Sequence, residues 1–316
     1  MPQQQCADAV LMIRPAAFDY TPETAASNRM QQRPAHGGGA ARERALAEFD
    51  GCVRTLRSEG IRVCVVEDTP EPAKPDAVFP NNWVSFHRDG TVVLYPMQAP
   101  NRRLERRREI VARVADELGF EVRHVLDLTA HESAGRFLEG TGSLVLDHVG
   151  RLAYACRSPR THPEVAAEWA RALGYELLSF AASDRHGVPL YHTNVMLSIG
   201  SRVVVVASAA IAVEERGALL ERLRASGREL IEIDQQGVAG FAGNVLELAS
   251  WDEALGDLSV LVMSSSARAA LGTQAFARLS ACADSVLTVP LPTIESLGGG
   301  SVRCMLAEVF VGTAAA

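Results

Sequence analysis

The segment from Asn194 to Ile233, NVMLSIGSRVVVVASAAIAVEERGALLERLRASGRELIEI, contains one complete unit from which the fold can be inferred. Two apolar runs, Asn194–Ile199 and Arg202–Ser208, flank Gly200-Ser201, which predicts two antiparallel strands joined by a tight turn. Glu214–Ser226 is predicted to be a helix, and Glu229–Ile233 a further strand. The segment therefore predicts a strand–strand–helix–strand unit.

The same order of elements recurs along the chain, and one unit combines the two ends of the sequence. A unit of this kind buries its apolar face only against neighbouring units. A unit shared between the two ends favours a closed ring over an open stack. We expect one α/β domain over residues 1–316, a five-bladed pseudo-symmetric α/β propeller of ββαβ repeats. The other predicted units are Ala77–His87, Thr91–Tyr95, Arg103–Leu118 and Phe120–Leu126; Gly142–Asp147, Arg151–Cys156, Pro163–Leu173 and Glu176–Phe180; Gly243–Leu248, Ser259–Met263, Ala267–Ala281 and Val286–Val289; and Val302–Val311 with Ala9–Arg14, Ala40–Ser58 and Ile61–Val66.

The composition is that of a globular protein, with 47% hydrophobic and 22% charged residues. The net charge of −7 argues against a nucleic-acid partner, which usually leaves a basic surface. No apolar run approaches the ~20 residues of a membrane span, and MPQQQCADAV lacks the features of a signal peptide, so we expect a cytoplasmic protein without a membrane partner. The six cysteines show no metal-type spacing, which predicts free thiols and no structural metal site. Phe18–Gly39 is predicted to be a long loop, with a possible role as a lid.

Several polar residues fall at the same point of successive repeats. Cys304 follows the glycine run Gly298–Gly300 at the start of a predicted strand, although most lone cysteines are small buried hydrophobes. His192 and Asn194 are two residues apart, so on a strand both side chains would point to one face. Glu139 lies between an apolar run and a hairpin, where a solvated rim carboxylate is the common alternative. A cysteine, a histidine and a carboxylate together are the components of a thiol-nucleophile enzyme.

Three further candidates complete this set. Asp76 and Asn82 lie in PDAVFPNNW, where the asparagines could equally form a turn. Arg160 follows a predicted strand and is suited to bind a carboxylate, the alternative being an exposed charge. Asn244 falls at the same phase of the fourth unit. In a closed ring, loops at equivalent positions converge on the axis, so we expect all of these side chains to meet there.

With these residues in view, the sequence resembles the guanidine-modifying (amidinotransferase) superfamily, which includes arginine deiminases, dimethylarginine dimethylaminohydrolases and glycine amidinotransferases. It is most similar to the citrulline-utilising hydrolase branch. The resemblance covers essentially the whole chain. It implies a five-bladed propeller (the pentein fold), no metal, no organic cofactor, a small amino-acid substrate and a covalent intermediate on cysteine. The motifs that carry it are MIRPAAFDYTPETAASN, PDAVFPNNW, YPMQAPNRRLER, RFLEGTGS, YHTNVML, GFAGNVLEL and GGGSVRCMLAEVF.

The resemblance assigns roles to individual positions. It implies that Cys304 is the nucleophile and His192 the general acid/base. Glu139 matches the glutamate of a Glu-Gly-Gly-Asp motif, Asp76 an aspartate that contacts substrate, and Arg160 an arginine that binds the α-carboxylate. We also expect a contribution to substrate binding from Asn28 and from Arg102 or Arg103.

Three positions depart from the pattern of the superfamily. The motif here reads Glu-Gly-Thr-Gly, so Gly142 replaces the aspartate that orients the histidine in amidinotransferases. Two aspartates that clamp guanidinium in deiminases fall on Asn82 and Asn194. A guanidinium is a permanent cation that calls for carboxylates in a dry pocket, whereas a ureido group is neutral and can pair with an amide.

The two asparagines therefore predict a citrulline hydrolase that yields ornithine, ammonia and carbon dioxide. We expect a lowered pKa of the Cys304 thiol beside His192. The oxyanion would be stabilised by backbone N–H groups of Gly298–Gly300 or by the two amides, and Glu139 would bind a ureido N–H. The alternatives are an arginine-type deiminase or amidinotransferase acting on a cationic guanidine, and a non-catalytic propeller that binds an amino acid. The sequence leaves homo-oligomerisation open.

Overall fold

The computed structural model describes residues 5–33, 39–254 and 256–311. Within these ranges it forms fifteen strands. The strands are β1 (Ala9–Arg14), β2 (Arg62–Glu67), β3 (Val84–Phe86), β4 (Thr91–Leu94), β5 (His124–Asp127), β6 (Leu144–Asp147), β7 (Leu152–Arg157), β8 (Glu176–Ala181), β9 (Leu197–Ile199), β10 (Val203–Val206), β11 (Glu229–Glu232), β12 (Leu246–Asp252), β13 (Gly256–Ser264), β14 (Ser285–Val289) and β15 (Ala307–Val309). The α-helices are α1 (Pro22–Ala25), α2 (Gly39–Ser58), α3 (Arg108–Leu118), α4 (Gly140–Ser143), α5 (Pro163–Leu173), α6 (Val213–Ala225), α7 (Gln235–Ala239) and α8 (Ser265–Ser280).

The described strands form five three-stranded sheets of one topology. In each sheet the middle strand pairs antiparallel with the first strand and parallel with the third, and a helix connects the middle strand to the third. The sheets are β15-β1-β2, β3-β4-β5, β6-β7-β8, β9-β10-β11 and β12-β13-β14. This mixed α/β arrangement of small sheets confirms the predicted ββαβ repeat.

The last strand belongs to the same sheet as the first, as expected from the repeat. β15 pairs antiparallel with β1, placing Ala9 opposite Val309, and β2 pairs with β1 in parallel register. A bridge between Ala7 and Leu248 joins the segment before β1 to β12, in the sheet β12-β13-β14. The two ends of the chain therefore build one unit between its neighbours.

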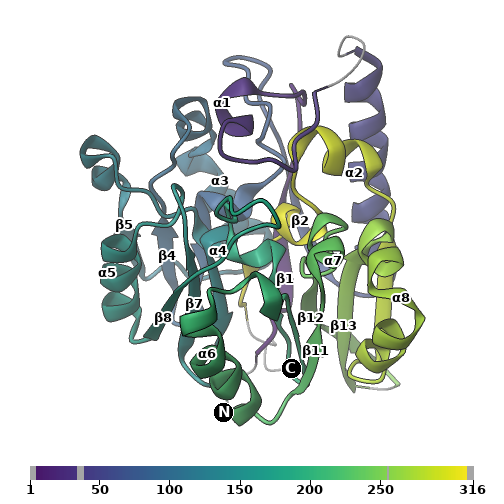
Figure 1. Cartoon of the computed structure of the whole chain (residues 1–316). Coiled ribbons are helices and arrows are strands. Elements are labelled where there is room, and N and C mark those ends of the chain that lie inside the picture. Colours follow the sequence, from purple (N-terminus) through teal and green to yellow (C-terminus); the bar gives the residue numbers. More distant parts are fainter. Residues whose placement is uncertain (1–4, 34–38, 255, 312–316) are drawn as a thin grey trace.

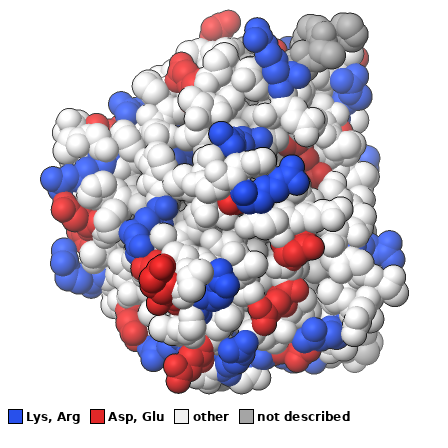
Figure 2. Space-filling view, in the orientation of Figure 1, with Lys and Arg blue, Asp and Glu red and all other residues white. Residues whose placement is uncertain are grey.

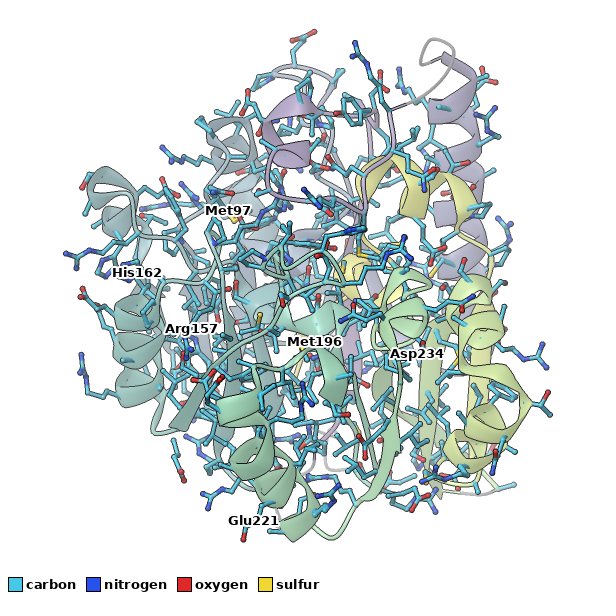
Figure 3. All side chains as sticks on the ribbon, viewed as in Figure 1. Met97, Arg157, His162, Met196, Glu221 and Asp234 are labelled. Atoms are coloured by element: carbon cyan, nitrogen blue, oxygen red, sulfur yellow. The ribbon has the colours of Figure 1, made fainter. Side chains whose placement is uncertain are left out.

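The long helices lie at the periphery and cover the sheets (Figure 1). α5 begins at Pro163 and ends at the predicted stop, Gly174, and its buried face includes Trp169. The Trp169 indole N–H donates to the Tyr95 hydroxyl at 2.9 Å, which ties this helix to the neighbouring unit. In Figure 3, Met196 lies in the interior, whereas Glu221 on α6 projects outward.

Four of the five first strands are shorter than predicted, because a helical turn precedes each of these four. These turns are Pro80–Asn82, α4, Thr193–Val195 and Val302–Met305. His192 and Asn194 therefore do not share a strand face, and that premise was wrong: His192 is the N-cap of the Thr193–Val195 turn. Each turn packs against a turn of a neighbouring unit, a non-local contact that overrides the strand-like sequence.

The surface carries charges of both signs. Figure 2 shows Lys, Arg, Asp and Glu interspersed over one face of the molecule. Among the described residues, no helix is both long enough and apolar enough to cross a membrane. The predicted loop Phe18–Gly39 contains the short helix α1, and its residues 34–38 lie outside the described ranges.

Candidate active site

The helical turns before the first strands bring the predicted site residues together. The Pro80–Asn82 turn contacts both α4 and the Val302–Met305 turn, and α4 also contacts the Thr193–Val195 turn. Asn82, His192 and Cys304 thus come from three different units. Asp76, Arg160 and Glu139 lie on segments next to these turns. Residues at equivalent positions of the repeats therefore lie close together in the folded chain.

Two glycines of the RFLEGTGS motif permit this close packing. A Cβ atom at Gly140 would lie 2.1 Å from the Asn81 carbonyl oxygen, and the residue has φ +47°. A Cβ atom at Gly142 would lie 2.5 Å from Asn82 Nδ2 and 2.7 Å from His192 Nδ1. Gly142, which stands where amidinotransferases have an aspartate, therefore leaves no room for that carboxylate beside His192.

A nearly closed cavity lies between these turns. Asp76, Asn82, Arg160, His192 and Cys304 all line it, and it holds about 10 Å³ of space for water-sized spheres. That is room for one water molecule. An amino acid can enter only if some of the lining residues move apart.

Glu139 and Asn194, the other two predicted site residues, are fully buried beside this cavity rather than on its wall. Glu139 lies behind His192 and Arg160 and accepts hydrogen bonds from both. Asn194 lies next to the sulfur atom of Cys304, with Nδ2 at 3.5 Å and Oδ1 at 3.8 Å. Neither residue reaches the cavity itself: Glu139 contacts the lining residues His192 and Arg160, and Asn194 contacts Cys304.

Cys304 is buried among neutral hydrogen-bond donors. The amide Nδ2 atoms of Asn244 and Asn194 lie 3.3 and 3.5 Å from its sulfur. Burial raises the pKa of the thiol, and the hydrogen bonds from the Ser301 segment, Asn244 and Asn194 offset only part of this increase. The prediction of a lowered pKa was therefore wrong: burial, which the sequence does not reveal, outweighs the donors. The free protein holds Cys304 as a thiol.

His192 and Glu139 form a buried pair. His192 Nε2 lies 2.8 Å from Glu139 Oε2, so the Nε2–H group donates to the carboxylate and Nδ1 is the acceptor nitrogen of the neutral ring. Burial lowers the pKa of His192 to about 4, although Glu139 counteracts this. Burial alone would raise the pKa of Glu139, but Arg160, the His192 hydrogen bond and Arg102 lower it well below its usual range. The imidazole is thus neutral and the carboxylate ionised.

Arg102 organises a second part of the site. Its guanidinium donates to both carboxylate oxygens of Glu105 at 2.9 Å, and its Nη1 donates to Asn82 Oδ1 at 2.7 Å. Burial raises the pKa of Glu105 to about 7 and also raises that of Asp76, against the opposing effect of Arg102. Arg102, one of two predicted alternatives, therefore lines the cavity. Arg103 instead donates to the carbonyls of Met97 and Gln98.

Arg160 connects the cavity to the segment around α1. Its Nη1 donates to Glu139 at 3.3 Å, its Nε to Ser27 Oγ at 2.9 Å and its Nη2 to the Thr24 carbonyl at 2.7 Å. This buried guanidinium has one carboxylate partner and lines the cavity. It is placed to meet an anionic group of a bound molecule.

The segment from Thr24 to Gln31 covers the cavity, and sequence reasoning found only one of its residues. Thr24 Oγ1 donates to Asp76 at 3.0 Å, and Gln31 Nε2 donates to the Gly298 carbonyl at 3.0 Å. Asn28, which was predicted, donates to the Gly299 carbonyl at 3.1 Å. The signal for the missed residues was a run of small and amide side chains inside a predicted loop.

The glycine run beside Cys304 is held from two sides. Tyr191 donates its hydroxyl proton to the Gly299 carbonyl at 2.5 Å, and the Gly299 N–H donates to the Glu295 carbonyl at 3.0 Å. Tyr191 was not predicted, although it directly precedes His192. Because the Gly299 N–H already has a partner, it is not available to an oxyanion in this state.

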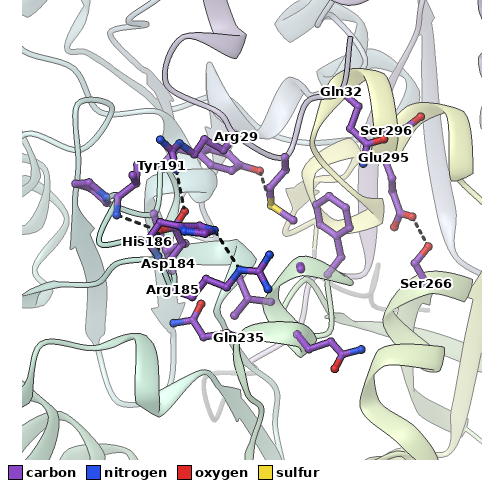
Figure 4. A pocket seen from close by; sticks show the side chains of 18 of the residues that line it. Arg29, Gln32, Asp184, Arg185, His186, Tyr191, Gln235, Ser266, Glu295 and Ser296 are labelled. Carbon is purple, nitrogen blue, oxygen red and sulfur yellow. Dashed lines mark hydrogen bonds and ion pairs between the residues drawn. The ribbon is translucent and has the colours of Figure 1, made fainter. Parts of the chain in front are cut away.

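A larger cavity of about 960 Å³ lies on the other side of this covering segment (Figure 4). Arg29 and Met30 line the larger cavity, whereas their neighbours Asn28 and Gln31 line the smaller one described above. Tyr191 lines both. The covering segment and Tyr191 therefore form the partition between the two spaces.

The chain is similar to known proteins in both sequence and fold. A family model described as N,N dimethylarginine dimethylhydrolase, eukaryotic, matches residues 14–311. A comparison with curated proteins finds no match. Among the described residues, no group of three or more His, Cys, Asp or Glu side chains is placed to hold a metal ion.

Several solved structures share the fold. The substrate-bound N-terminal domain of ArgZ, an arginine dihydrolase from cyanobacteria, matches with a TM-score of 0.71 and 19% identity over 96% of this chain and 98% of that domain. AgrE in complex with L-arginine matches with a TM-score of 0.71 and 20% identity over 96% of this chain and 41% of AgrE. DDAH from Pseudomonas aeruginosa in complex with citrulline matches with a TM-score of 0.65 and 15% identity over 96% and 99% of the two chains.

Proposed function

The chain belongs to the N,N dimethylarginine dimethylhydrolase family, within the pentein or amidinotransferase superfamily, and on this basis we propose that it is a cysteine-dependent citrulline hydrolase. The reaction consumes citrulline and one water molecule and releases ornithine, ammonia and carbon dioxide. Cys304 is the nucleophile, His192 the general acid/base, and Glu139 the carboxylate that positions His192. The five sheets close into a single-domain ring around this site.

The observation that carries the proposal is the neutral amide of Asn194 beside the sulfur. Its Nδ2 and Oδ1 atoms lie 3.5 and 3.8 Å from Cys304 Sγ. A carboxylate at this position would oppose formation of the thiolate unless a substrate cation neutralised it. A ureido group brings no such cation, whereas a guanidinium does. An amide beside the nucleophile therefore suits citrulline.

The charged part of the cavity suits the other end of an amino acid. Arg160 and Asp76 both line the cavity and carry opposite charges when ionised. Arg160 binds the α-carboxylate, and Asp76 accepts from the α-ammonium group. Both side chains now bind the covering segment, Arg160 through Thr24 and Ser27 and Asp76 through Thr24. Substrate replaces these internal partners when it enters.

The neutral states of Cys304 and His192 determine how the thiolate forms. Since His192 is neutral and Cys304 is a thiol, the imidazole accepts the thiol proton as the sulfur attacks the ureido carbon. The resulting imidazolium is stabilised by the ionised carboxylate of Glu139, 2.8 Å away. His192 then protonates the departing nitrogen, and the bond from carbon to that nitrogen breaks. Finally, it removes a proton from water, which attacks the carbon bound to sulfur. The carbon–sulfur bond then breaks, the Cys304 sulfur takes the proton back from His192, and the released carbamic acid decomposes to carbon dioxide and the second nitrogen product.

The oxyanion formed during attack needs a donor that is present in the cavity. Asn82 lines the cavity and its Nδ2 donates to Asn81 Oδ1 at 2.9 Å, leaving the second hydrogen of this amide for the ureido oxygen. The cavity has room for about one water molecule, so little water competes with this interaction. Asn82 is therefore the proposed oxyanion donor.

A cationic guanidine is the rival substrate, and one feature of the site favours it. Three buried carboxylates, Asp76, Glu105 and Glu139, surround the two guanidinium groups of Arg102 and Arg160. If all five groups are ionised, one negative charge remains, which would suit an additional cation. The raised pKa of Glu105, about 7, and that of Asp76 instead allow the site to take up a proton and become neutral.

Substrate tests decide between these possibilities. The purified full-length protein should release ornithine and ammonia from citrulline, and Cys304→Ala should release neither. Arginine and N,N-dimethylarginine serve as comparison substrates under the same conditions. Conversion of arginine to citrulline, with citrulline left untouched, would overturn the proposal. A protein that binds citrulline but turns over none of the three would support the non-catalytic alternative.

A further inference from the structure

We infer that Asn244 is a further catalytic residue, one that holds Cys304 in its reactive position and donates a hydrogen bond to the thiolate. This inference rests on the proposed role of Cys304 as the nucleophile. The geometry around Asn244 is independent of the substrate.

Asn244 makes three contacts that converge on Cys304. Its Nδ2 donates to Cys304 Sγ at 3.3 Å and to the Asn194 carbonyl at 3.0 Å, and its Oδ1 accepts from the Arg303 backbone N–H at 3.1 Å. The residue has no exposed surface. Both hydrogens and the oxygen of the amide are therefore engaged, and the side chain does not line the catalytic cavity. Its function is directed at the nucleophile and not at the substrate.

The segment that carries Asn244 is held firmly against its neighbours. Phe241 has φ +61° and accepts the Asn244 N–H at 2.8 Å, which closes the turn before β12. A Cβ atom at Gly243 would lie 2.7 Å from the Val195 carbonyl oxygen, so this turn packs directly on the Thr193–Val195 turn. Arg303 Nη1 donates to the Val245 carbonyl at 3.2 Å. The turn before β12 thus clamps residues 303 and 304 through both backbone and side chain.

A neutral donor is the appropriate group at this position. Cys304 is buried, and a thiolate in an apolar setting is costly unless donors or a cation stabilise it. The groups that face the sulfur or share its cavity are Arg303, Tyr191, His192, Asp76, Arg102 and Arg160. Asn244 supplies a fixed donor at the sulfur itself. A donor aimed at a developing negative charge typically contributes ~10²-fold or more to turnover.

The test compares Asn244→Asp with Asn244→Ser and the wild type, using the full-length protein. Asp keeps the size and the acceptor for the Arg303 N–H but replaces the donor with a carboxylate; Ser keeps a hydroxyl donor. The readout is the rate of iodoacetamide alkylation of Cys304 as a function of pH, with the site identified by peptide mass. Asn101→Asp is the matched control. The Asn101 side chain donates to Thr21 Oγ1 and does not line the catalytic cavity.

We expect Asn244→Asp to shift the alkylation profile upward by about one pH unit or more, since a nearby carboxylate disfavours the thiolate. Its kcat for citrulline should fall ~10²-fold with a KM within about threefold of the wild type. Asn244→Ser should recover part of the alkylation rate. A double variant, Asn244→Asp with Cys304→Ala, should still bind citrulline, which verifies that the Asn244→Asp substitution leaves the protein folded.

An alkylation profile in Asn244→Asp that coincides with the wild-type profile would overturn the inference, and so would an unchanged kcat. Failure of the proposed function has a different signature. In that case the wild type would not turn over citrulline, while the shift in Cys304 alkylation between wild type and Asn244→Asp would still be present.

Discussion

Around the Cys304 sulfur the donors are the neutral amides of Asn194 and Asn244, whereas the remainder of the cavity is bordered by an ionic network that includes Arg102 and Arg160. Both regions are buried, so the difference does not come from solvent. Opposite charges in the network compensate each other, which makes their burial tolerable. Near the sulfur, Arg303 is the charged group that affects the pKa of Cys304, and the donors from Ser301, Asn244 and Asn194 are neutral.

This separation suggests how one small cavity can treat the two ends of an amino acid differently. In the proposed reaction the charged region recognises the α-carboxylate and α-ammonium groups, which are ions in every standard amino acid. The neutral region receives the group that reacts. If the reacting group were a cation, the carboxylates would be expected at the sulfur and not away from it. The following changes test this division, from the largest expected effect to the smallest.

Removing the nucleophile should have the largest effect. Cys304→Ala should reduce ornithine release from citrulline by ~10⁴-fold or more, since covalent catalysis has no alternative route at this site. The measurement is ornithine and ammonia release by the wild type and the variant at equal protein concentration. Cys282→Ser, at a thiol far from the cavity, is the control and should retain wild-type turnover. If both variants lost turnover equally, the loss in Cys304→Ala would reflect reduced stability of the protein and not the missing nucleophile.

Removing the charge of Glu139 tests whether the ionic region supports the reaction. Glu139→Gln leaves Arg160 with one carboxylate partner fewer and removes the anion that stabilises the His192 imidazolium. We expect kcat for citrulline to fall ~10²–10³-fold, a size typical of lost general-acid/base assistance. Glu164→Gln, which breaks an exposed pair with Arg136, provides the matched control.

The pH dependence of turnover gives a second measure of the same pair. Because the pKa of His192 is lowered to about 4, the imidazole stays neutral above that pH, and kcat/KM should decline only as the pH falls toward 4. Without Glu139, which raises the pKa of His192, this decline should move to still lower pH. A decline near pH 6.5 in the wild type, the ordinary region for histidine, would contradict the buried neutral ring.

Introducing a carboxylate at Asn194 tests the neutral region directly. Asn194→Asp places a negative charge within 3.5–3.8 Å of the sulfur, where it should raise the pKa of the thiol further. We expect citrulline turnover to fall ~10–100-fold, because a like charge at this short range makes the thiolate less stable by a few kcal/mol. Binding of arginine to the variant, measured by calorimetry in a Cys304→Ala background, should become tighter. Unchanged preference between arginine and citrulline would refute the charge-matching argument.

The repeat was predictable from sequence because its signals are local. Turn residues such as Gly200-Ser201 and helix stops such as Gly174 lie next to the elements that they delimit. The helical turns before the first strands were not predictable in this way. The Val302–Met305 turn has a strand-like sequence and is held in helical form by contact with the Pro80–Asn82 turn more than 200 residues away.

The candidate site also combines features that local sequence predicts with features that depend on contacts between distant segments. Cys304, His192 and Glu139 could be proposed from the type and phase of the residues together with the family resemblance. The Glu139–His192 bond, the role of Asn244 at the sulfur and the raised pKa of Cys304 all depend on how neighbouring units pack. Burial sets that pKa, and burial depends on how all the neighbouring units pack around the residue. Residue identity alone could therefore name the participants without giving their ionisation states.

Asn82→Asp should have the smallest effect of these changes on the pKa of Cys304, although the superfamily pattern treats positions 82 and 194 alike. Arg102 Nη1 already donates to Asn82 Oδ1 at 2.7 Å, so a carboxylate at this position would form an ion pair and lose most of its influence on the sulfur. The substitution removes the Nδ2 donor proposed for the oxyanion, and Arg102 stays in place as a cation beside the side-chain oxygen at position 82. We expect an alkylation profile of Cys304 close to that of the wild type, whereas citrulline turnover should fall ~10²-fold because the proposed oxyanion donor is lost. Parallel measurement of both variants tests the division between the regions: if Asn82→Asp shifts the alkylation profile as far as Asn194→Asp does, Arg102 does not neutralise position 82, and the boundary between the ionic and neutral regions does not lie where this structure places it.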